Sequence, residues 1–177
     1  MLMRSDEQPL AELARYGRRV LDALDIRHGA AHLEVKLTPD GPRLVEAGAR
    51  MSGLPHYTTD LLGEGQLEWI VDAYVRPERF RARAGRAYRR RRAFAWAALV
   101  APAAGRLVRY RALDRLRELE SFRDLTVLVG PGDPIVPTTY DRGYPATLTL
   151  EHPVDAVLQR DLNTVRHLDG AGMYDIE

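Results

Sequence analysis

The sequence contains no cysteine and only one lysine, Lys36, among its 177 residues. The absence of cysteine excludes disulfides, thiol catalysis and thiolate-bound metals. The sequence also has no apolar run near the roughly 20 residues that cross a membrane, and its start lacks the apolar core of a signal peptide. We therefore expect a cytoplasmic protein without a membrane partner, in which arginine supplies nearly all of the positive charge.

Hydrophobic residues make up 45% of the chain, which is enough for the core of one domain or of two small ones. The formal net charge of +1 gives the whole chain no polyelectrolyte character. The sequence has no Gly-x-Ser-x-Gly nucleophile motif, no phosphate loop of the Gly-Lys-Thr type and no internal repeat. Any catalytic or binding residues must therefore be found in a different sequence pattern.

Residues 32–53 carry the clearest pattern in the chain. In two runs, 32–37 and 45–50, apolar and polar residues alternate with a period of two, which predicts two half-buried strands. Between these runs, residues 38–42 read Thr-Pro-Asp-Gly-Pro and have the proline and glycine that a chain reversal needs. We therefore predict a β-hairpin centred on Asp40.

A hairpin centred on Asp40 has two chemically different faces. The apolar residues share one face: Leu33, Val35, Leu37, Val45, Ala47 and Ala49. The polar residues and one glycine share the other face: His32, Glu34, Lys36, Glu46, Gly48 and Arg50. In this register Glu34 lies directly across from Glu46, and Lys36 lies across from Leu44.

The opposed carboxylates of Glu34 and Glu46 would repel each other and weaken the strand pair. A divalent cation between them would offset the repulsion, and Mg²⁺ is typically bound by one or two carboxylates together with substrate phosphates. Arg50 follows on the same face, about 13 Å from Glu46 along the strand, where its guanidinium could meet an anion. Gly48 leaves room for a close approach. The alternative is a hairpin whose glutamates only face water.

Glu34, Glu46 and Arg50, the last two in the segment Glu-Ala-Gly-Ala-Arg, resemble the metal-binding hairpin of the ATP-grasp superfamily. The flanking segments 28–32 (His-Gly-Ala-Ala-His) and 41–46 (Gly-Pro-Arg-Leu-Val-Glu) look most like its carboxylate–amine ligase branch, which includes the L-amino acid ligases that make dipeptides. The resemblance implies that Glu34 and Glu46 hold Mg²⁺ bridging the phosphates of ATP. It also implies that Arg50 is catalytic and stabilises the acyl-phosphate or tetrahedral intermediate.

The resemblance implies further roles around the hairpin. Gly48 stands where the family commonly has an asparagine that binds the metal, although related ligases also have glycine, so the number of metal positions stays open. His32 and Lys36, on the polar face, are candidate contacts of ATP. Ser52 and Gly53 belong to a loop that borders the acceptor site in the family, and free backbone N–H groups in such a loop could hold an anion.

The segments around the hairpin are predicted from their periodicity and charge. Residues 10–24 should form a helix, which the resemblance places on the back of the sheet, and residues 61–74 should form one or two helices. Residues 76–92 hold nine arginines against Glu78. Clustered arginine can neutralise nucleic-acid phosphates. The rest of the chain balances this charge and no aromatic platform follows, so we favour a solvated linker over a nucleic-acid partner.

Residues 93–177 are predicted to form a second unit. Apolar segments and turns give the order strand, strand, helix, strand, strand, strand, helix, which is typical of an antiparallel sheet with helices on one face. The last helix is expected to begin at Pro153 and to close at Gly170. This terminal helix, ending in Met173-Tyr174, and the Pro-Gly-Asp turn at 131–133 resemble the small C-terminal subdomain of these ligases.

The predicted fold is α+β in two parts: residues 1–80 as the C-terminal part of an ATP-grasp catalytic core, and residues 81–177 as a C-terminal α+β subdomain. The predicted function is that of the C-terminal half of a carboxylate–amine ligase. ATP would activate a carboxylate as an acyl phosphate, and the amine of a substrate such as an amino acid would displace phosphate.

Residues before Ala11 do not encode the lysine and the adenine-holding segment that such ligases use to bind ATP. We therefore expect weak ATP binding by the chain alone, and a complementing chain or a homo-oligomer as partner. The alternative is a non-catalytic remnant that binds a partner or a ligand.

Overall fold

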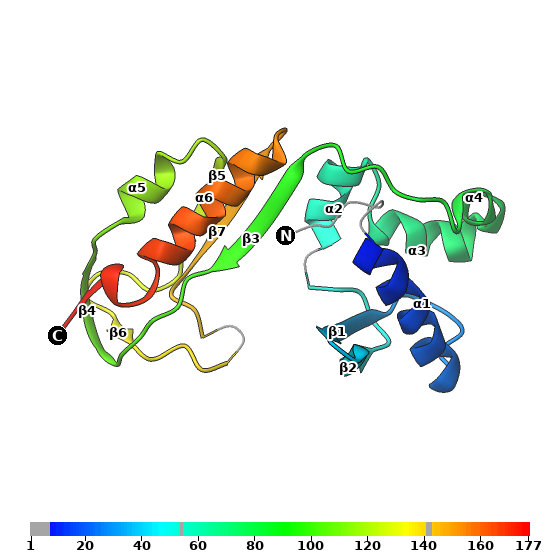
Figure 1. Cartoon of the computed structure of the whole chain (residues 1–177), viewed down its shortest axis with the longest axis horizontal. Helices are drawn as coiled ribbons and strands as arrows, with labels where there is room; N and C mark the ends of the chain where they lie inside the picture. Colours follow the sequence, from blue (N-terminus) through cyan, green and yellow to red (C-terminus); the bar gives the residue numbers. More distant parts are fainter. Residues whose placement is uncertain (1–7, 54, 141–142) are drawn as a thin grey trace. The chain divides into compact units, whose positions relative to one another are not determined.

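The computed structural model describes residues 8–53, 55–140 and 143–177. The chain divides into two compact units, one ending at Arg91 and the other running from Arg92 to the C-terminus (Figure 1). Both units contain helices and antiparallel strands, which confirms the predicted α+β class. Within the described residues, no helix is long and apolar enough to span a membrane.

The first unit consists of a helix, a hairpin and three short helices. These elements are α1 (Gln8–Ala23), β1 (His32–Thr38), β2 (Gly41–Gly48), α2 (Pro55–Leu62), α3 (Gln66–Val75) and α4 (Pro77–Arg83). Helix α1 and the hairpin lie where the periodicity predicts them. The predicted helical region around residues 61–74 is divided into α2 and α3 at Gly63, whose φ of 84° is unfavourable for other residues.

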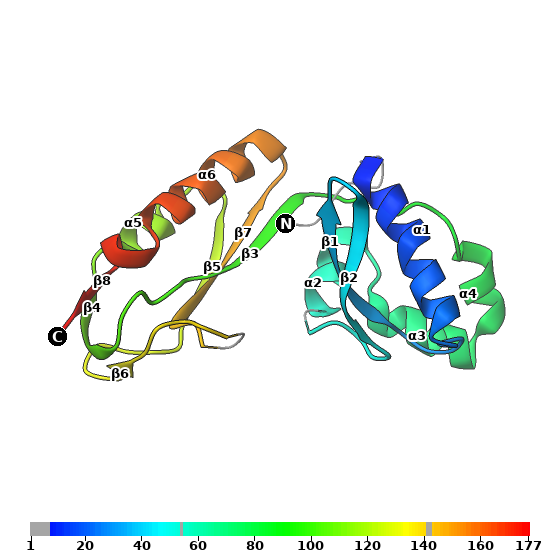
Figure 2. The same ribbon diagram turned by 60° about the horizontal axis from the view of Figure 1, so that its bottom comes forward.

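Helix α1 lies against the apolar face of the hairpin (Figure 2). The contact is close because Gly17 has no side chain: a Cβ at this position would lie 3.0 Å from Cδ1 of Leu33. Glycine lowers the helix propensity of α1. The same residue lets the helix approach the sheet that carries the candidate site.

The hairpin contains a β-bulge that the sequence pattern does not predict. Glu34 pairs with Glu46, as predicted, but the next pair is Val35 with Leu44. Val45 is therefore an extra residue on β2, and a bulge of this kind leaves the ladder locally unpaired. The bulge has a physical benefit, because an uninterrupted register would place Leu44 among the carboxylates.

The bulge exchanges residues between the two faces. Lys36 pairs with Arg43, so the predicted pairing of Lys36 with Leu44 is wrong. Leu44 joins the apolar face instead, and its backbone N–H donates a hydrogen bond to the hydroxyl of Tyr16 on α1 at 2.9 Å. Val45, predicted on the apolar face, is 66% exposed. One hydrogen bond from α1 thus satisfies the backbone group that the bulge removes from the ladder.

The first half of the arginine-rich segment is the helix α4 and not the solvated linker that its composition predicts. Its position depends on Asp72 of α3, which is 1% exposed. Arg76 Nε lies 2.7 Å from Oδ1 of Asp72, and Arg83 Nη2 lies 2.6 Å from Oδ2. A buried carboxylate needs such partners because an unpaired buried charge is strongly unfavourable. These ion pairs connect α4 to α3.

The second unit has two three-stranded sheets, in the orders β3-β7-β5 and β6-β4-β8, with the described pairs antiparallel. Its strands are β3 (Ala93–Ala98), β4 (Gly105–Tyr110), β5 (Phe122–Val127), β6 (Pro134–Ile135), β7 (Ala146–His152) and β8 (Tyr174–Ile176). Its helices are α5 (Leu113–Arg117) and α6 (Asp155–Leu168). Leucine and alanine side chains from both sheets and from α6 form one buried cluster.

The C-terminal segment is a strand, whereas the sequence predicts the end of a helix there. Helix α6 ends at Leu168, and Gly170 then turns the chain with a φ of 79°. In β8, Asp175 accepts hydrogen bonds from Arg111 and Arg109, each Nε at 2.7 Å. These bonds from Arg111 and Arg109 lower the pKa of Asp175 to about 2. Strand β8 is therefore held by its pairing with β4 and by the ion pairs of Asp175. Its sequence has no period that would predict a strand.

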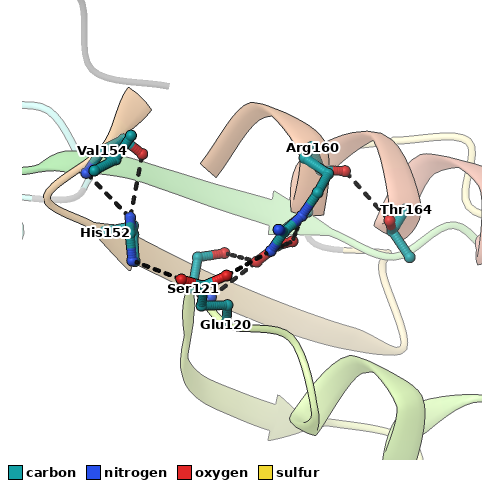
Figure 3. A network of polar contacts seen from close by, with 7 residues as sticks. Glu120, Ser121, His152, Val154, Arg160 and Thr164 are labelled. Atoms are coloured by element: carbon teal, nitrogen blue, oxygen red, sulfur yellow. Dashed lines mark hydrogen bonds and ion pairs between the residues drawn. The ribbon is translucent and has the colours of Figure 1, made fainter. Parts of the chain in front are cut away.

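A polar network ties α6 to the residues just before β5 (Figure 3). Asp161 is 2% exposed and accepts hydrogen bonds from the backbone N–H and the hydroxyl of Ser121, both at 2.8 Å. Arg160 donates to Asp161 at 2.8 Å and to Glu120 at 3.0 Å. Burial raises the pKa of Asp161, but the bonds from Ser121 and Arg160 outweigh it, so the pKa lies below its ordinary value.

We expect Tyr16→Phe to loosen the bulge without changing the order of the strands. The variant loses the acceptor of the Leu44 N–H, and such a bond contributes about 0.5–1.5 kcal/mol. The Leu44 amide should therefore exchange with solvent faster, which hydrogen exchange followed by NMR measures. Tyr74→Phe is the matched control and should leave that rate unchanged. An unaltered Leu44 rate in Tyr16→Phe would show that this hydroxyl does not hold the bulge.

We expect Asp161→Asn to lower the free energy of unfolding of the second unit by about 2 kcal/mol at neutral pH, since hydrogen bonds to a charged group contribute about 1.5–3 kcal/mol. Because the folded-state pKa of Asp161 is lowered, its stabilisation is present above the ordinary carboxyl pKa and is lost as the pH falls through the folded-state value. The two proteins should therefore converge in acid.

Urea unfolding at neutral and acidic pH measures this convergence. The control Asp114→Asn changes an exposed carboxylate that forms a surface ion pair with Arg117, so it should alter stability by less than about 1 kcal/mol. A difference between the wild type and Asp161→Asn that stays constant from neutral to acidic pH would contradict the assignment.

Candidate functional site

The polar face of the hairpin arranges its charges in rows. Glu34 pairs with Glu46, and the next pair on the same face is Lys36 with Arg43. Successive rows on one face are two residues, or about 7 Å, apart. Two carboxylates therefore lie beside two cations, and this arrangement can hold a metal ion next to phosphate groups.

The carboxylates of Glu34 and Glu46 are exposed on this face. Opposed like charges on paired strands destabilise each other. In the part of the chain that the structure describes, no three His, Cys, Asp or Glu side chains gather into a metal site. The pair therefore fits Mg²⁺, which usually keeps several waters and needs only one or two carboxylates, better than Zn²⁺, which takes three or four protein ligands.

Arg50 lies closer to the carboxylates than a straight strand predicts, since a straight strand would separate it from Glu46 by about 13 Å. Strand β2 ends at Gly48, the chain then bends, and Nη2 of Arg50 lies 3.5 Å from Oε1 of Glu46. Nη1 of the same guanidinium donates to the carbonyl of Met51 at 3.0 Å. Arg50 thus partly offsets the repulsion between the two glutamates. A metal ion bound by Glu46 would compete with this ion pair.

Gly48 makes this position of the arginine possible. A Cβ at Gly48 would lie 3.4 Å from both Cγ and Nε of Arg50. The side chain of Arg50 therefore packs over bare backbone, and an asparagine in place of Gly48 would extend into the same space. The missing side chain at Gly48 thus leaves the space in which Arg50 forms its ion pair with Glu46.

His32 and Lys36 have free capacity for polar contacts. His32 pairs with Gly48 at the start of β1, and its Nδ1 is buried without a hydrogen bond to any described residue. Buried polar atoms are nearly always hydrogen-bonded, so an unpaired one is a candidate contact for a ligand. The ammonium of Lys36 is exposed beside the carboxylate row.

The loop after Arg50 is fastened to α3. The backbone N–H of Ser52 donates to Oε1 of Gln66 at 3.1 Å, and the Ser52 hydroxyl donates to the same oxygen at 3.4 Å. The N–H of Ser52 is therefore not free to hold an anion, contrary to the expectation for this loop. Gly53 is exposed, and apart from its chain neighbours no described residue has an atom within 4 Å of the place a Cβ would occupy.

Three residues that shape the site are missing from the sequence prediction. Arg43 faces Lys36, Tyr16 holds the bulge, and Gln66 fixes the loop at Ser52. Tyr16 and Gln66 act through contacts between separate segments, which no local period reveals. Arg43 could have been found, because the predicted register places this charged residue on the apolar face, and a charge on a core face signals an error in pattern or register.

The comparison with protein families finds no matching family model. Two curated proteins have similar sequences. Dapdiamide A synthase from Enterobacter agglomerans is 29% identical over 127 residues, which are 68% of this chain and 29% of that protein. Carnosine synthase 1 from Gallus gallus is 46% identical over 43 residues, which are 24% of this chain and 5% of that protein. The chain thus spans less than a third of the length of these relatives.

Three solved structures match nearly the whole chain. An L-amino acid ligase from Bacillus licheniformis matches 100% of this chain and 44% of its own, with a TM-score of 0.72 and 16% identity. Phosphoribosylglycinamide synthetase from Anaerococcus prevotii matches 97% and 44%, with a TM-score of 0.61 and 12% identity. N5-carboxyaminoimidazole ribonucleotide synthetase from Thermotoga maritima matches 92% and 41%, with a TM-score of 0.54 and 17% identity.

These three solved structures are ATP-grasp ligases, and at such low identities the matches show the fold alone. They agree with the family that the hairpin residues resemble. The chain therefore has the fold of the C-terminal half of an ATP-grasp ligase.

Proposed function

We propose that this chain is the part of an ATP-dependent carboxylate–amine ligase that holds metal-bound phosphates and stabilises the reaction intermediate. The observation that carries the proposal is the pairing of Glu34 directly across from Glu46, with Arg50 3.5 Å from Glu46. The similarity to Dapdiamide A synthase and to an L-amino acid ligase supports a reaction that joins an amino acid through an amide bond.

In the proposed reaction, a carboxylate takes the γ-phosphoryl group of ATP, which leaves ADP and an acyl phosphate. An amine then attacks the acyl carbon and displaces phosphate. Glu34 and Glu46 would hold Mg²⁺, which neutralises phosphate charge when it is bound. Arg50 would leave Glu46 and place its guanidinium beside the acyl oxygen, on which negative charge develops when the amine attacks the acyl carbon. A planar guanidinium suits this role because it can make two parallel hydrogen bonds.

The remaining polar residues would position the substrates. His32 and Lys36 would contact the nucleotide, and Arg43 would extend the positive row beside the carboxylates. Ser52 and Gly53 would border the acceptor amine, with Gly53 as the open position of the two.

The hairpin also exposes apolar surface. Leu37, Leu44 and Val45 are 46%, 39% and 66% exposed. Large apolar side chains grouped on one exposed element mark an interaction surface. We propose that the nucleotide-binding half of the ligase, supplied by a complementing chain, covers this surface, and that the isolated chain self-associates through it.

We expect Glu34→Gln to leave the isolated chain as stable as the wild type, or to raise its free energy of unfolding by a few tenths to about 1 kcal/mol, because it removes like-charge repulsion. Glu46→Gln should gain less, since it also removes the ion pair with Arg50, and an exposed pair contributes up to about 1 kcal/mol. Excess Mg²⁺ should stabilise the wild type more than either variant, because a metal bound only by the folded chain stabilises it.

Chemical denaturation with and without Mg²⁺ measures all of these differences. Glu78→Gln, which changes an exposed acid outside the hairpin, is the control and should respond to Mg²⁺ like the wild type. If Glu34→Gln unfolded the chain, the carboxylates would be structural and the metal assignment would be wrong.

We expect the isolated chain to bind Mg-ATP weakly and to show no ATPase activity. Combined with its nucleotide-binding half, Glu46→Gln should abolish amide formation because one of the two carboxylates that would hold the metal is lost. Arg50→Lys should also lose turnover with its fold intact, because a point charge cannot replace a planar fork. Calorimetry, melting temperatures and assays of the amide product test these expectations.

Two outcomes would count against the ligase proposal. Normal turnover by Glu46→Gln would show that Glu46 does not hold an essential metal. Micromolar binding of Mg-ATP by the isolated monomer would show that the chain needs no second half to bind the nucleotide. A wild-type complex that assembles but forms no amide would favour a non-catalytic binding module.

A further inference from the structure

Residues 84–91 form a strap that returns from the end of α4 to the end of α2. Gly85, with a φ of 79°, turns the chain after α4. The backbone N–H of Arg91 donates to the carbonyl of Leu61 at 2.9 Å, and the Arg91 side chain packs where Gly63 has no Cβ. The strap, together with α3 and α4, borders a cavity of about 210 Å³.

Three of the eight described residues that line this cavity are arginines. Arg83, Arg86 and Arg89 line it, together with Glu64 and Trp69. The guanidinium of Arg83 lies over the ring of Trp69, 5.5 Å from its centroid, and pairs with Glu64 through Nη1. Arg83 is therefore held in place by an aromatic ring and by carboxylates, as a rigid part of the cavity wall.

Two arginines beside the cavity lack an ion-pair partner among the residues that the structure describes. Arg86 and Arg89 form no ion pair with any residue that the structure describes, whereas the charge of Arg83 is balanced by Glu64 and the buried Asp72. A phosphate monoester carries a charge of about −1.5 to −2 at pH 7, so one such group would match this excess.

Two residues of the cavity wall also carry buried hydrogen-bond donors that have no acceptor among the described residues. Nε of Arg83 and Nε1 of Trp69 are buried, and neither has a hydrogen-bond partner among the described residues. Buried donors are nearly always paired in folded proteins, so each one without a partner needs an explanation. An anion with several oxygens, bound in the cavity, would supply the missing acceptors.

We propose that this cavity binds a dianionic phosphate group, either inorganic phosphate or the phosphate of a small metabolite. Arg86 and Arg89 would neutralise its charge, and the rigid Arg83 and Trp69 would present donors to its oxygens. Arginine suits the site because its planar fork matches phosphate geometry. None of the described residues that line the cavity belongs to the hairpin, so the inference does not rest on the proposed ligase function.

The experiment titrates the full chain with inorganic phosphate and, separately, with glycerol 3-phosphate, in chloride buffer at constant ionic strength. Arg86→Gln and Arg89→Gln should each weaken binding by about tenfold, the effect of losing one charge-assisted contact. Arg81→Gln is the matched control, because it removes the same charge from α4 at a position that does not line the cavity. It should leave the affinity unchanged.

A second readout locates the ligand. The chain has two tryptophans, so an NMR spectrum resolves two indole N–H signals. The signal of Trp69 should shift on titration, and that of Trp96 in β3 should not. Stronger binding of glycerol 3-phosphate than of inorganic phosphate would identify a metabolite ester as the occupant, and the reverse would identify the free ion.

Three outcomes would overturn the proposal. The first is the absence of saturable binding. The second is equal weakening by Arg81→Gln and Arg86→Gln, which would mean that the whole arginine-rich surface attracts anions. The third is tighter binding of an oligonucleotide that Arg81→Gln weakens as much as Arg89→Gln does, which would indicate a nucleic-acid surface instead of a cavity for a small phosphate.

Discussion

The strand register of one hairpin determines where the charges of the candidate site lie. Side chains alternate along a strand, so a slip of one residue moves every following side chain to the other face. The extra residue Val45 introduces such a slip of one residue. The hydroxyl of Tyr16 accepts a hydrogen bond from the backbone N–H of Leu44, which the slip leaves unpaired. Through this one contact α1 keeps Leu44 on the apolar face and Arg43 beside the carboxylates.

The sequence predicts those features that depend on local alternation, and it misses those that depend on contacts between distant segments. The two strands and the pairing of Glu34 with Glu46 follow from a period of two. The bulge depends on Tyr16, which lies 28 residues before Leu44. Strands β6 and β8 have two and three residues, too few to show a period. Helix α4 has the composition of a linker, and its ion pairs with Asp72, which pack it against α3, are not visible in the local sequence.

Arginine neutralises buried carboxylates in several parts of the fold. Asp72 and Asp161 are buried carboxylates, and each is paired with guanidinium groups of its own or a neighbouring helix. Arginine suits such sites because its charge is permanent, weakly hydrated and spread over several donors. In a chain with a single lysine, arginine provides structural pairing as well as the charges of the candidate site. Arg86 and Arg89 of the strap have no such partner among the residues that the structure describes, and are therefore the ones to examine for ligands.

The ion pair between Arg50 and Glu46 connects metal binding to the proposed role of the arginine. Glu46 can be neutralised either by the guanidinium or by a cation shared with Glu34, and Gly48 leaves the space that the first arrangement needs. In the proposed reaction, Mg²⁺ at the carboxylates would release Arg50 toward the acyl group. The linkage is reciprocal: whatever draws Arg50 away from Glu46 must strengthen metal binding by the same factor. An anionic intermediate that binds Arg50 would therefore hold the metal more tightly than the resting site does.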